Sequence, residues 1–247
     1  NGFLLEDLTS ESGQLSNLSK DATDPTKYTA TFTPAANVQD PGNLISLDLT
    51  GVTDLSSGAA GVGTAVSGNY AVDTQIVKIS FDAIVASAAS GIPLWVPNGY
   101  SALNWDNFAA VKPKNVLPGT GYDLLASGAD DAVVFNSAGL PASVSRFGAD
   151  FDFLTGTFAA AWNDGLKLTI ESWDDSILVG SGSVTFAFGT PVVIDFSQLN
   201  ATGSTLSSWA AGSRFTSIDT LVFRSFGGVA ATPQGYATHV AADDWQI

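Results

Sequence analysis

The sequence predicts an all-β fold of sandwich or jelly-roll architecture, and two observations carry this prediction. Short segments in which apolar and polar residues alternate recur along the chain, separated by turn signals about every 8–12 residues. The acidic residues are mostly ones that do not favour helices: the chain has 21 aspartates and only three glutamates. The 247 residues are enough for one large or two modest β-domains with buried cores.

The individual elements follow from this alternation and from the turn residues between the strands. The expected strands, in chain order, are residues 28–33, 44–49, 77–81, 132–135, 166–173, 183–188, 192–196 and 220–223. Turns are expected at Asp40-Pro41-Gly42-Asn43, Asn163-Asp164-Gly165 and Gly227-Gly228. Residues 54–68, rich in Gly, Ala and Ser, predict a long loop, and residues 206–211 predict at most one helical turn.

Charge and composition exclude several classes of partner. The net charge of −15 and the pI of about 4.1 argue against binding to nucleic acid or to an anionic membrane surface, because both repel such a chain. No apolar stretch approaches the roughly 18 residues of a membrane span, so we expect no direct membrane insertion. The absence of cysteine excludes disulfides and thiol chemistry. An Asp-rich β-chain without cysteine is typical of the bacterial cell surface, and we expect an extracellular location.

The excess of aspartate suggests calcium. Asp is a short, hard-oxygen ligand that a loop can fold around a Ca²⁺ ion. Asp is also favoured in turns that bind no metal, so the composition leaves both interpretations open. The charge by itself is explained equally well by solubility in a salty medium.

Four short segments of the first 76 residues form a recognisable set. They are Tyr28–Pro34 (Y-T-A-T-F-T-P), Val52-Thr53-Asp54, the loop Ala60–Gly63 and Tyr70–Thr74 (Y-A-V-D-T). By this set, residues 1–76 resemble a bacterial Ig-like domain of the kind repeated along giant secreted adhesins, which implies an Ig-like β-sandwich segment. The family's first one or two strands have no counterpart ahead of Asn1, so we expect a partial or split module in a longer multidomain chain.

The resemblance also implies candidate calcium ligands in this first region. In the family the V-D-T triplet marks the junction to the next module, where Asp residues often hold a linker Ca²⁺ ion. Carried over to this sequence, the candidates are Asp54 and Asp73. The alternative for Asp54 is a turn cap.

Residues 77–247 carry a second set of segments. They are Ile79–Ile84 (I-S-F-D-A-I), Pro97–Phe108 (P-N-G-Y-S-A-L-N-W-D-N-F), Ala159–Leu166 (A-A-A-W-N-D-G-L) and the closing Ala241–Trp245 (A-A-D-D-W). This region resembles a jelly-roll domain that is widespread in secreted bacterial and fungal proteins. The resemblance implies a jelly-roll β-sandwich but leaves the activity open.

The jelly-roll topology predicts a metal site at the terminal strands. In carbohydrate-binding jelly rolls these two strands lie side by side and their carboxylates hold a structural Ca²⁺ ion. Asp82 stands near the first strand of this region, and Asp243 and Asp244 stand in the last one. These three are the candidate ligands, and the alternative is that Asp244 faces solvent on an edge strand.

A ligand pocket is predicted around residues 100–108. Tyr100 and Trp105 offer rings for stacking, and Asp106 and Asn107 offer hydrogen-bonding groups beside them. The alternative is that Trp105 and Phe108 belong to the core while the two polar residues stabilise a turn. Further candidate ligand residues stand in the Asp-bearing loops, Asp130, Asp131, Asn163 and Asp164. For Asn163 and Asp164 a tight turn is again the competing interpretation.

Catalysis has little support in the sequence. The pairs Asp130-Asp131 and Asp174-Asp175 suit glycosidase acid–base chemistry in composition, but nothing around them separates their pKa values. The single histidine, His239, lies in an alternating segment, where we expect a structural role, and no G-x-S-x-G, H-E-x-x-H or phosphate-binding motif occurs. We therefore expect a protein that is not an enzyme.

Three functions remain, from different classes. The first is the ligand-binding region of a large RTX-type calcium-dependent adhesin, which binds a small polar ligand, a peptide terminus or a saccharide, on another cell. The second is a structural spacer or matrix protein without a ligand, and the third and weakest is a polysaccharide hydrolase. The first is favoured because the second module interrupts an Ig-like array, and such modules usually have a task of their own.

Overall fold

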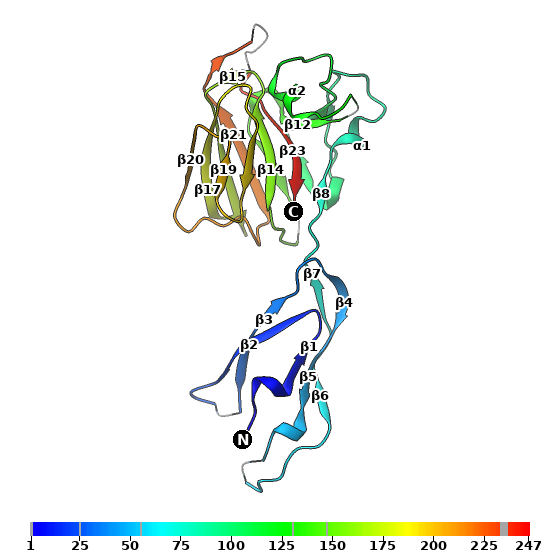
Figure 1. Cartoon of the computed structure of the whole chain (residues 1–247), viewed down its shortest axis with the longest axis vertical. Coiled ribbons are helices and arrows are strands. Elements are labelled where there is room, and N and C mark those ends of the chain that lie inside the picture. Colours follow the sequence, from blue (N-terminus) through cyan, green and yellow to red (C-terminus); the bar gives the residue numbers. More distant parts are fainter. Residues whose placement is uncertain (1, 25, 55, 130, 147, 233–236) are drawn as a thin grey trace. The chain divides into compact units, whose positions relative to one another are not determined.

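The computed structural model describes residues 2–24, 26–54, 56–129, 131–146, 148–232 and 237–247. The fold is nearly all β, which confirms the predicted fold class (Figure 1). The chain forms two compact units, Asn1–Ile76 and Val77–Ile247. Within the part that the structure describes, no helix is long and apolar enough to cross a membrane.

The first unit consists of three small antiparallel sheets. Its strands are β1 (Leu8–Ser10), β5 (Ile45–Asp48) and β6 (Thr64–Val66) in one sheet, β2 (Gly13–Lys20) paired with β3 (Tyr28–Pro34), and β4 (Gln39–Asn43) paired with β7 (Tyr70–Asp73). Two 3₁₀ turns, Leu5–Asp7 and Leu49–Gly51, accompany them. Its interior is small: Val72 is its one buried hydrophobic residue among those described, and Phe32 packs edge-on against Tyr70 at 5.3 Å between ring centroids. Strand pairing therefore carries much of this unit's stability.

The second unit contains a six-stranded antiparallel sheet. In spatial order its strands are β10 (Asn104–Asp106), β13 (Ala142–Ser145), β21 (Thr220–Phe226), β16 (Leu166–Asp174), β17 (Ile177–Phe186) and β20 (Leu206–Trp209). Alternate residues of these strands point inward, as in the pattern of β16, where Leu166, Leu168 and Ile170 are buried. The residues between them face the outside of the sheet.

An eight-stranded sheet forms the other layer. Its strands are β19 (Asn200–Thr202), β18 (Val192–Asp195), β14 (Thr155–Ala160), β23 (Val240–Gln246), β12 (Val133–Asn136), β11 (Phe108–Val111) and β9 (Leu94–Trp95), and β8 (Lys78–Ile79) also pairs with β23. The short helices α1 (Asp82–Val85) and α2 (Gly121–Leu125), the 3₁₀ turns Tyr100–Ala102 and Ser137–Gly139, and the ribbon β15 (Asn163–Asp164) with β22 (Val229–Ala230) lie in the connections.

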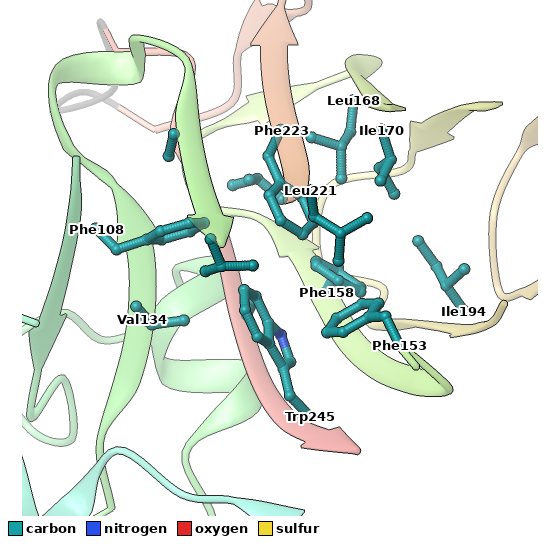
Figure 2. Close-up of a cluster of buried hydrophobic side chains, with 14 of the residues drawn as sticks. Phe108, Val134, Phe153, Phe158, Leu168, Ile170, Ile194, Leu221, Phe223 and Trp245 are labelled. Atoms are coloured by element: carbon teal, nitrogen blue, oxygen red, sulfur yellow. The ribbon is translucent and has the colours of Figure 1, made fainter. Parts of the chain in front are cut away.

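Between the two sheets lies an aromatic core centred on Trp245 (Figure 2). The Trp245 ring stacks on Trp105 at 5.5 Å and on Phe223 at 5.4 Å, so it joins strands of both layers. Phe108, Phe153 and others meet it edge-on. Each fully buried side chain of this size stabilises the fold by about 1.5–3 kcal/mol, which makes this core the main source of the unit's stability.

The eight-stranded sheet is buried on both faces at β11 and β12. All four residues of each strand are buried, because the segment around α2 covers the outer face. Tyr122 of α2 packs edge-on against Phe135 at 5.3 Å between ring centroids. Continuous apolar runs such as Phe108–Val111 are therefore explained by burial on both sides.

Four local predictions are wrong. The turn expected at Asp40-Pro41-Gly42-Asn43 lies within β4, at a shift in its register with β7. Within the helical turn expected at residues 206–211, Leu206–Trp209 form strand β20, in which Trp209 packs against Phe196 at 5.9 Å. The expected loop 54–68 contains β6, which pairs with β5. The strand expected over 77–81 is only β8, since helix α1 begins at Asp82.

Candidate functional site

Strand β23 changes its neighbour at Asp243 and Asp244. Its first half pairs with β12 through Ala242, and its second half pairs with β8 through Trp245. On its other side the register with β14 shifts at the same place, and Asp244 adopts a left-handed φ of 53°. The two aspartates therefore stand at a break in the sheet, where backbone pairing leaves room for side chains.

Asp82 and Asp131 approach this break from the two neighbouring strands. Asp82 begins α1 directly after β8, and its Oδ1 accepts a hydrogen bond from the backbone N–H of Ala132 at 2.8 Å. Its Oδ2 accepts from the Ser80 hydroxyl at 2.7 Å. Because Asp131 is bonded to Ala132, this contact brings the two carboxylates to one place.

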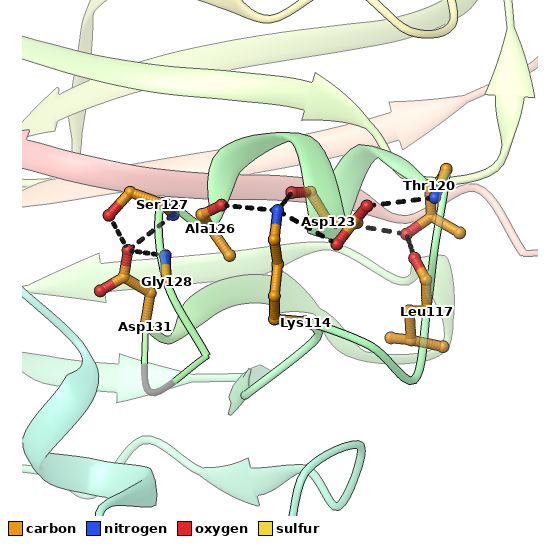
Figure 3. Close-up of polar contacts among 9 residues, drawn as sticks. Lys114, Leu117, Thr120, Asp123, Ala126, Ser127, Gly128 and Asp131 are labelled. Atoms are coloured by element: carbon orange, nitrogen blue, oxygen red, sulfur yellow. Dashed lines mark hydrogen bonds and ion pairs between the residues drawn. The ribbon is translucent and has the colours of Figure 1, made fainter.

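Asp131 is held by the loop that precedes it. One carboxylate oxygen accepts from the backbone N–H of Ser127 at 2.6 Å, from the Ser127 hydroxyl and from the N–H of Gly128 at 3.0 Å (Figure 3). These hydrogen bonds, those of the Ser127 hydroxyl above all, and the nearby Lys114 keep the pKa of Asp131 below its usual range. The carboxylate is therefore ionised at neutral pH.

Asp243 has the opposite environment. The pKa of its carboxyl is raised to about 7, mainly by partial burial, and the backbone N–H of Asp244 opposes this shift. The negative charges of Asp244, Asp82 and Asp131 contribute to this rise, so these three carboxylates lie within reach of the charge of Asp243. We refer to Asp82, Asp131, Asp243 and Asp244 as the terminal-strand carboxylate cluster.

The terminal-strand carboxylate cluster contains the three residues for which the sequence predicted a metal site. The structure adds Asp131, which the sequence suggested for ligand binding instead, while its neighbour Asp130 lies outside the described residues. Asp82 also lines a depression of about 430 Å³ together with Lys112, whose Nζ donates to the carbonyl of Ala86 at 3.1 Å. A divalent cation would neutralise the mutual repulsion of these carboxylates.

The segment predicted to form the pocket is largely structural. Trp105 is buried in the core, and its Nε1 donates to the carbonyl of Tyr100 at 2.9 Å, so its ring is not available to a surface ligand. The prediction for Trp105 is thus corrected, because inward alternation in β10 places it beneath the sheet. The Tyr100 hydroxyl donates to the carbonyl of Ser80, and its ring stacks on Phe81.

The two polar residues of that segment differ from each other. Asn107 has a left-handed φ of 56°, and its amide donates to the carbonyls of Ser137 at 3.1 Å and Pro141 at 3.0 Å, which fixes the turn. Asp106 is exposed on the outer face of the six-stranded sheet, opposite Ser143 of β13.

Asn163 and Asp164 fix the β15–β22 ribbon. The buried Asn163 amide donates to the carbonyl of Gly227 at 3.3 Å, and Asp164 Oδ1 accepts from the backbone N–H of Phe188 at 2.8 Å. Gly165 follows with a φ of +69°, as a tight turn requires. Both side chains are engaged in contacts that hold the backbone.

In the first unit, the two candidate calcium ligands make local hydrogen bonds. Asp54 Oδ1 accepts from the backbone N–H groups of Ser56 at 2.9 Å and Ser57 at 2.7 Å, and from both hydroxyls, which holds the pKa of Asp54 far below its usual range. This is the geometry of a turn cap. Asp73 accepts from the Gln75 N–H at 3.3 Å and the Gln39 amide at 3.4 Å.

A second acidic group lies at one end of the six-stranded sheet. Oxygens of Asp174, Asp175 and Asp219 come within 4.8 Å of one another, the one such trio among the described residues, and the terminal-strand carboxylate cluster is more widely spread. Asp174 pairs with Arg214 at 2.5 Å, so part of this charge is neutralised. Asp175 and Asp219 line a groove of about 750 Å³ on the outer face of the sheet, which the sequence did not reveal.

His239 lies in an aromatic cluster on the outer side of the eight-stranded sheet. Its Nδ1 is 2.5 Å from the Tyr122 hydroxyl and 3.4 Å from Nε1 of Trp162. Burial lowers the pKa of His239 to about 4, so the ring is neutral at physiological pH. The indole Nε1 of Trp162 can only donate, so Nδ1 is the acceptor in that contact. This environment suits a residue that supports packing.

Comparison with known proteins finds a similarity for the first unit. Residues 1–72 match a family model described as a bacterial Ig-like domain, which points to a module of an extracellular surface protein. A crystal structure of a DUF4465 family protein from Bacteroides caccae is similar to 70% of this chain and 99% of its own, at 10% sequence identity and a TM-score of 0.44. No curated protein matches the chain.

Proposed function

We propose that this chain is part of a calcium-dependent adhesin on the bacterial cell surface, of the large RTX type, and that its second unit is a non-catalytic ligand-binding head. The bacterial Ig-like match of residues 1–72 supports the surface location. The ligand would be a small polar group, a peptide terminus or a saccharide, on another cell. Weak binding, with a Kd of about 10⁻³ to 10⁻⁵ M, is sufficient where many copies are displayed.

One observation carries the calcium part of the proposal: Asp243 is partly buried beside three other carboxylates. Without a cation, ionising Asp243 at neutral pH costs free energy, since desolvation and the neighbouring negative charges both oppose it. Ca²⁺ accepts six to eight oxygen ligands in flexible geometry, and carboxylates from α1, β23 and the start of β12 would supply several of them.

Calcium would then act as a clamp on the fold. It would tie β8 and α1 to β12 and to β23, the strands that meet at the break in the sheet. The ligand head would keep its shape only while this junction is closed. Calcium dependence of adhesion would follow from the stability of the head.

The test is a thermal melt of the whole chain with excess EGTA, with Ca²⁺ and with Mg²⁺. All six tryptophans lie within residues 77–247, so tryptophan fluorescence follows the second unit. At about 100 times its Kd, Ca²⁺ should stabilise the unit by about 2.7 kcal/mol, and Mg²⁺ should do less because it requires stricter geometry. Asp243→Asn should remove most of this gain.

A matched control is Asp195→Asn, which removes the same charge from a turn cap at Ser197 outside the cluster. Ca²⁺ should stabilise Asp195→Asn by as much as it stabilises the parent. Identical melts of the calcium-loaded and calcium-free parent, after removal of bound ions is verified by mass spectrometry, would refute the calcium clamp.

A further inference from the structure

The groove on the six-stranded sheet is built from side chains of four adjacent strands. Asn104 of β10 lies opposite Ser145 of β13, Ser145 opposite Thr220 of β21, and Thr220 opposite Trp173 of β16. Cross-strand partners share a face, and the residues next to them, such as Trp105 and Leu221, point into the core. The four side chains therefore form one row on the outer face.

Three loops surround this row. They contribute Arg146, Gly148, Ala149 and Asp150 after β13, Asp175 and Ser176 in the β16–β17 turn, and Asp219 before β21. The enclosed volume of about 750 Å³ is in the range of small-molecule sites, about 300–1,000 Å³. The lining combines one aromatic ring with amide, hydroxyl, guanidinium and carboxylate groups.

Backbone hydrogen bonds hold these loops in place. The N–H of Arg146 donates to the carbonyl of Asp219 at 2.8 Å, and the N–H of Asp219 donates to the carbonyl of Trp173 at 3.0 Å. The carboxylate of Asp219 accepts from the N–H of Asp175 at 2.8 Å. The polar groups are thus positioned before any ligand arrives, which reduces the entropy cost of binding.

Charge decides which polar ligand fits. The groove is lined by the carboxylates of Asp150, Asp175 and Asp219 and by one guanidinium, that of Arg146, so it is net negative. Such a surface repels the carboxylate of a peptide C-terminus. Saccharide hydroxyls donate to carboxylates and accept from Asn104 and Arg146, and the apolar face of a sugar ring packs on the half-buried Trp173.

We propose that this groove binds a neutral saccharide, held by Trp173, Asn104 and Arg146 and by the carboxylates of Asp175 and Asp219. The inference rests on the proposed role of the second unit as a ligand-binding head and selects the ligand class. A simple cation site is a weaker interpretation, because Asp174 is already paired with Arg214 and Asp219 already accepts a backbone N–H.

The test is a titration followed by ¹H–¹⁵N NMR on the whole chain. The neutral probes are the hexasaccharides of β-1,4-glucan, β-1,3-glucan, α-1,4-glucan and β-1,4-mannan, and the anionic probes are hexagalacturonate and a hexapeptide with a free C-terminus. The six indole N–H signals are separately observable, and Trp173→Phe identifies the signal of Trp173. At least one neutral probe should shift that signal with a Kd of about 10⁻³ to 10⁻⁵ M, and the anionic probes should not.

Two substitutions on β10 provide a matched pair. Asn104 lines the groove, whereas Asp106 is two residues further on the same strand and face, in the next row beside Ser143. Asn104→Ala should weaken binding of the neutral probe about three- to tenfold through loss of a hydrogen bond. Asp106→Asn should leave the Kd within about twofold. Trp173→Ala should weaken binding at least tenfold, with tryptophan fluorescence melts confirming that the variant is folded.

The outcomes separate this inference from the proposed function. Binding of the peptide or of hexagalacturonate in the groove, or of Ca²⁺ alone with no saccharide, would overturn the saccharide assignment while leaving a ligand-binding head. No binding of any probe up to about 10 mM would overturn both the saccharide assignment and the head. Binding of a neutral probe that is insensitive to Asn104→Ala and Trp173→Ala would place the ligand elsewhere and refute the groove.

Discussion

Asp82 Oδ1 accepts a hydrogen bond at 2.8 Å from the backbone N–H of Ala132, 50 residues further along the chain. The bond fastens the start of α1 to the residue before β12. It also fixes where two of the four carboxylates of the terminal-strand carboxylate cluster stand. The Asp82 side chain thus stabilises the fold as a hydrogen-bond acceptor, and it also contributes a negative charge to the terminal-strand carboxylate cluster.

Two substitutions at Asp82 separate these roles. Asp82→Asn keeps an oxygen that can accept from Ala132 and removes the charge, whereas Asp82→Ala removes both. We expect Asp82→Ala to lower the free energy of unfolding by about 1–3 kcal/mol in EGTA, and Asp82→Asn to change it much less. In excess Ca²⁺, the free energy of unfolding of both variants should increase less than that of the parent. Equal stability of the two variants in EGTA would contradict the role of the hydrogen bond.

The pH dependence of calcium-free stability should report on Asp243. Its folded pKa of about 7 lies above the ordinary value of 3.8, so the folded state holds the proton more tightly. The resulting stabilisation is full below about pH 4 and is lost as the pH rises through 7. Asp243→Asn should remove this dependence and make the calcium-free protein more stable than the parent at pH 8. Chemical denaturation of the parent and of Asp243→Asn in EGTA between pH 4 and 8 measures the pH dependence and the stability difference at pH 8.

His239 gives a slope of the opposite sign and must be separated from Asp243. Its folded pKa of about 4 lies below the ordinary 6.5, so the stability that it contributes above pH 6.5 is lost as the pH falls toward 4. The difference in stability between the parent and Asp243→Asn cancels the His239 contribution. A pH-independent difference would contradict the assignment of the raised pKa to Asp243.

The contacts of His239 predict a fixed tautomer. Because Nε1 of Trp162 can only donate, Nδ1 is the acceptor and the proton of the neutral ring should sit on Nε2, which is buried without a hydrogen-bond partner among the described residues. Long-range ¹H–¹⁵N NMR should show this tautomer at pH 7 and no protonation of the ring down to about pH 5. Tyr122→Phe should destabilise the second unit by about 1 kcal/mol.

Gly182 is predicted to tolerate no side chain. A Cβ at this position would lie 2.0 Å from the Trp209 ring, so Gly182→Ala must displace a side chain that packs into the core. We expect a loss of about 1–3 kcal/mol, measured by denaturant unfolding. Gly128→Ala is the control, since nothing lies within 4 Å of its added Cβ, and it should be neutral within about 1 kcal/mol.

The sequence predicted the β-class well because alternation is a local property. Segments such as Leu166–Trp173 became strands with small changes of boundary. It failed at Leu206–Trp209, where small polar residues hid a strand that is fixed by its pairing with β17 and by the packing of Trp209 against Phe196. Pairing partners decide such short elements, and a single sequence does not show them.

The candidate site residues could likewise be predicted only in part from the sequence. The family topology was enough to place Asp82 beside Asp243, but Asp131 joined them only through the Ala132 hydrogen bond. Trp105 was ambiguous because a ring next to Asp106 fits both a pocket wall and a core, and only the direction of β10 decides between them. The groove was invisible because its row takes one residue from each of four strands.

The position of β23 has a consequence for how the second unit folds. This strand is the last of the unit, yet it lies between β14 on one side and β12 and β8 on the other, so it alone joins the two halves of its sheet. Until residues 240–246 have left the ribosome, the sheet has no centre and Trp245 is missing from the core. Long-range closure of this kind is slow. The second unit should therefore close only after β23 has been synthesised.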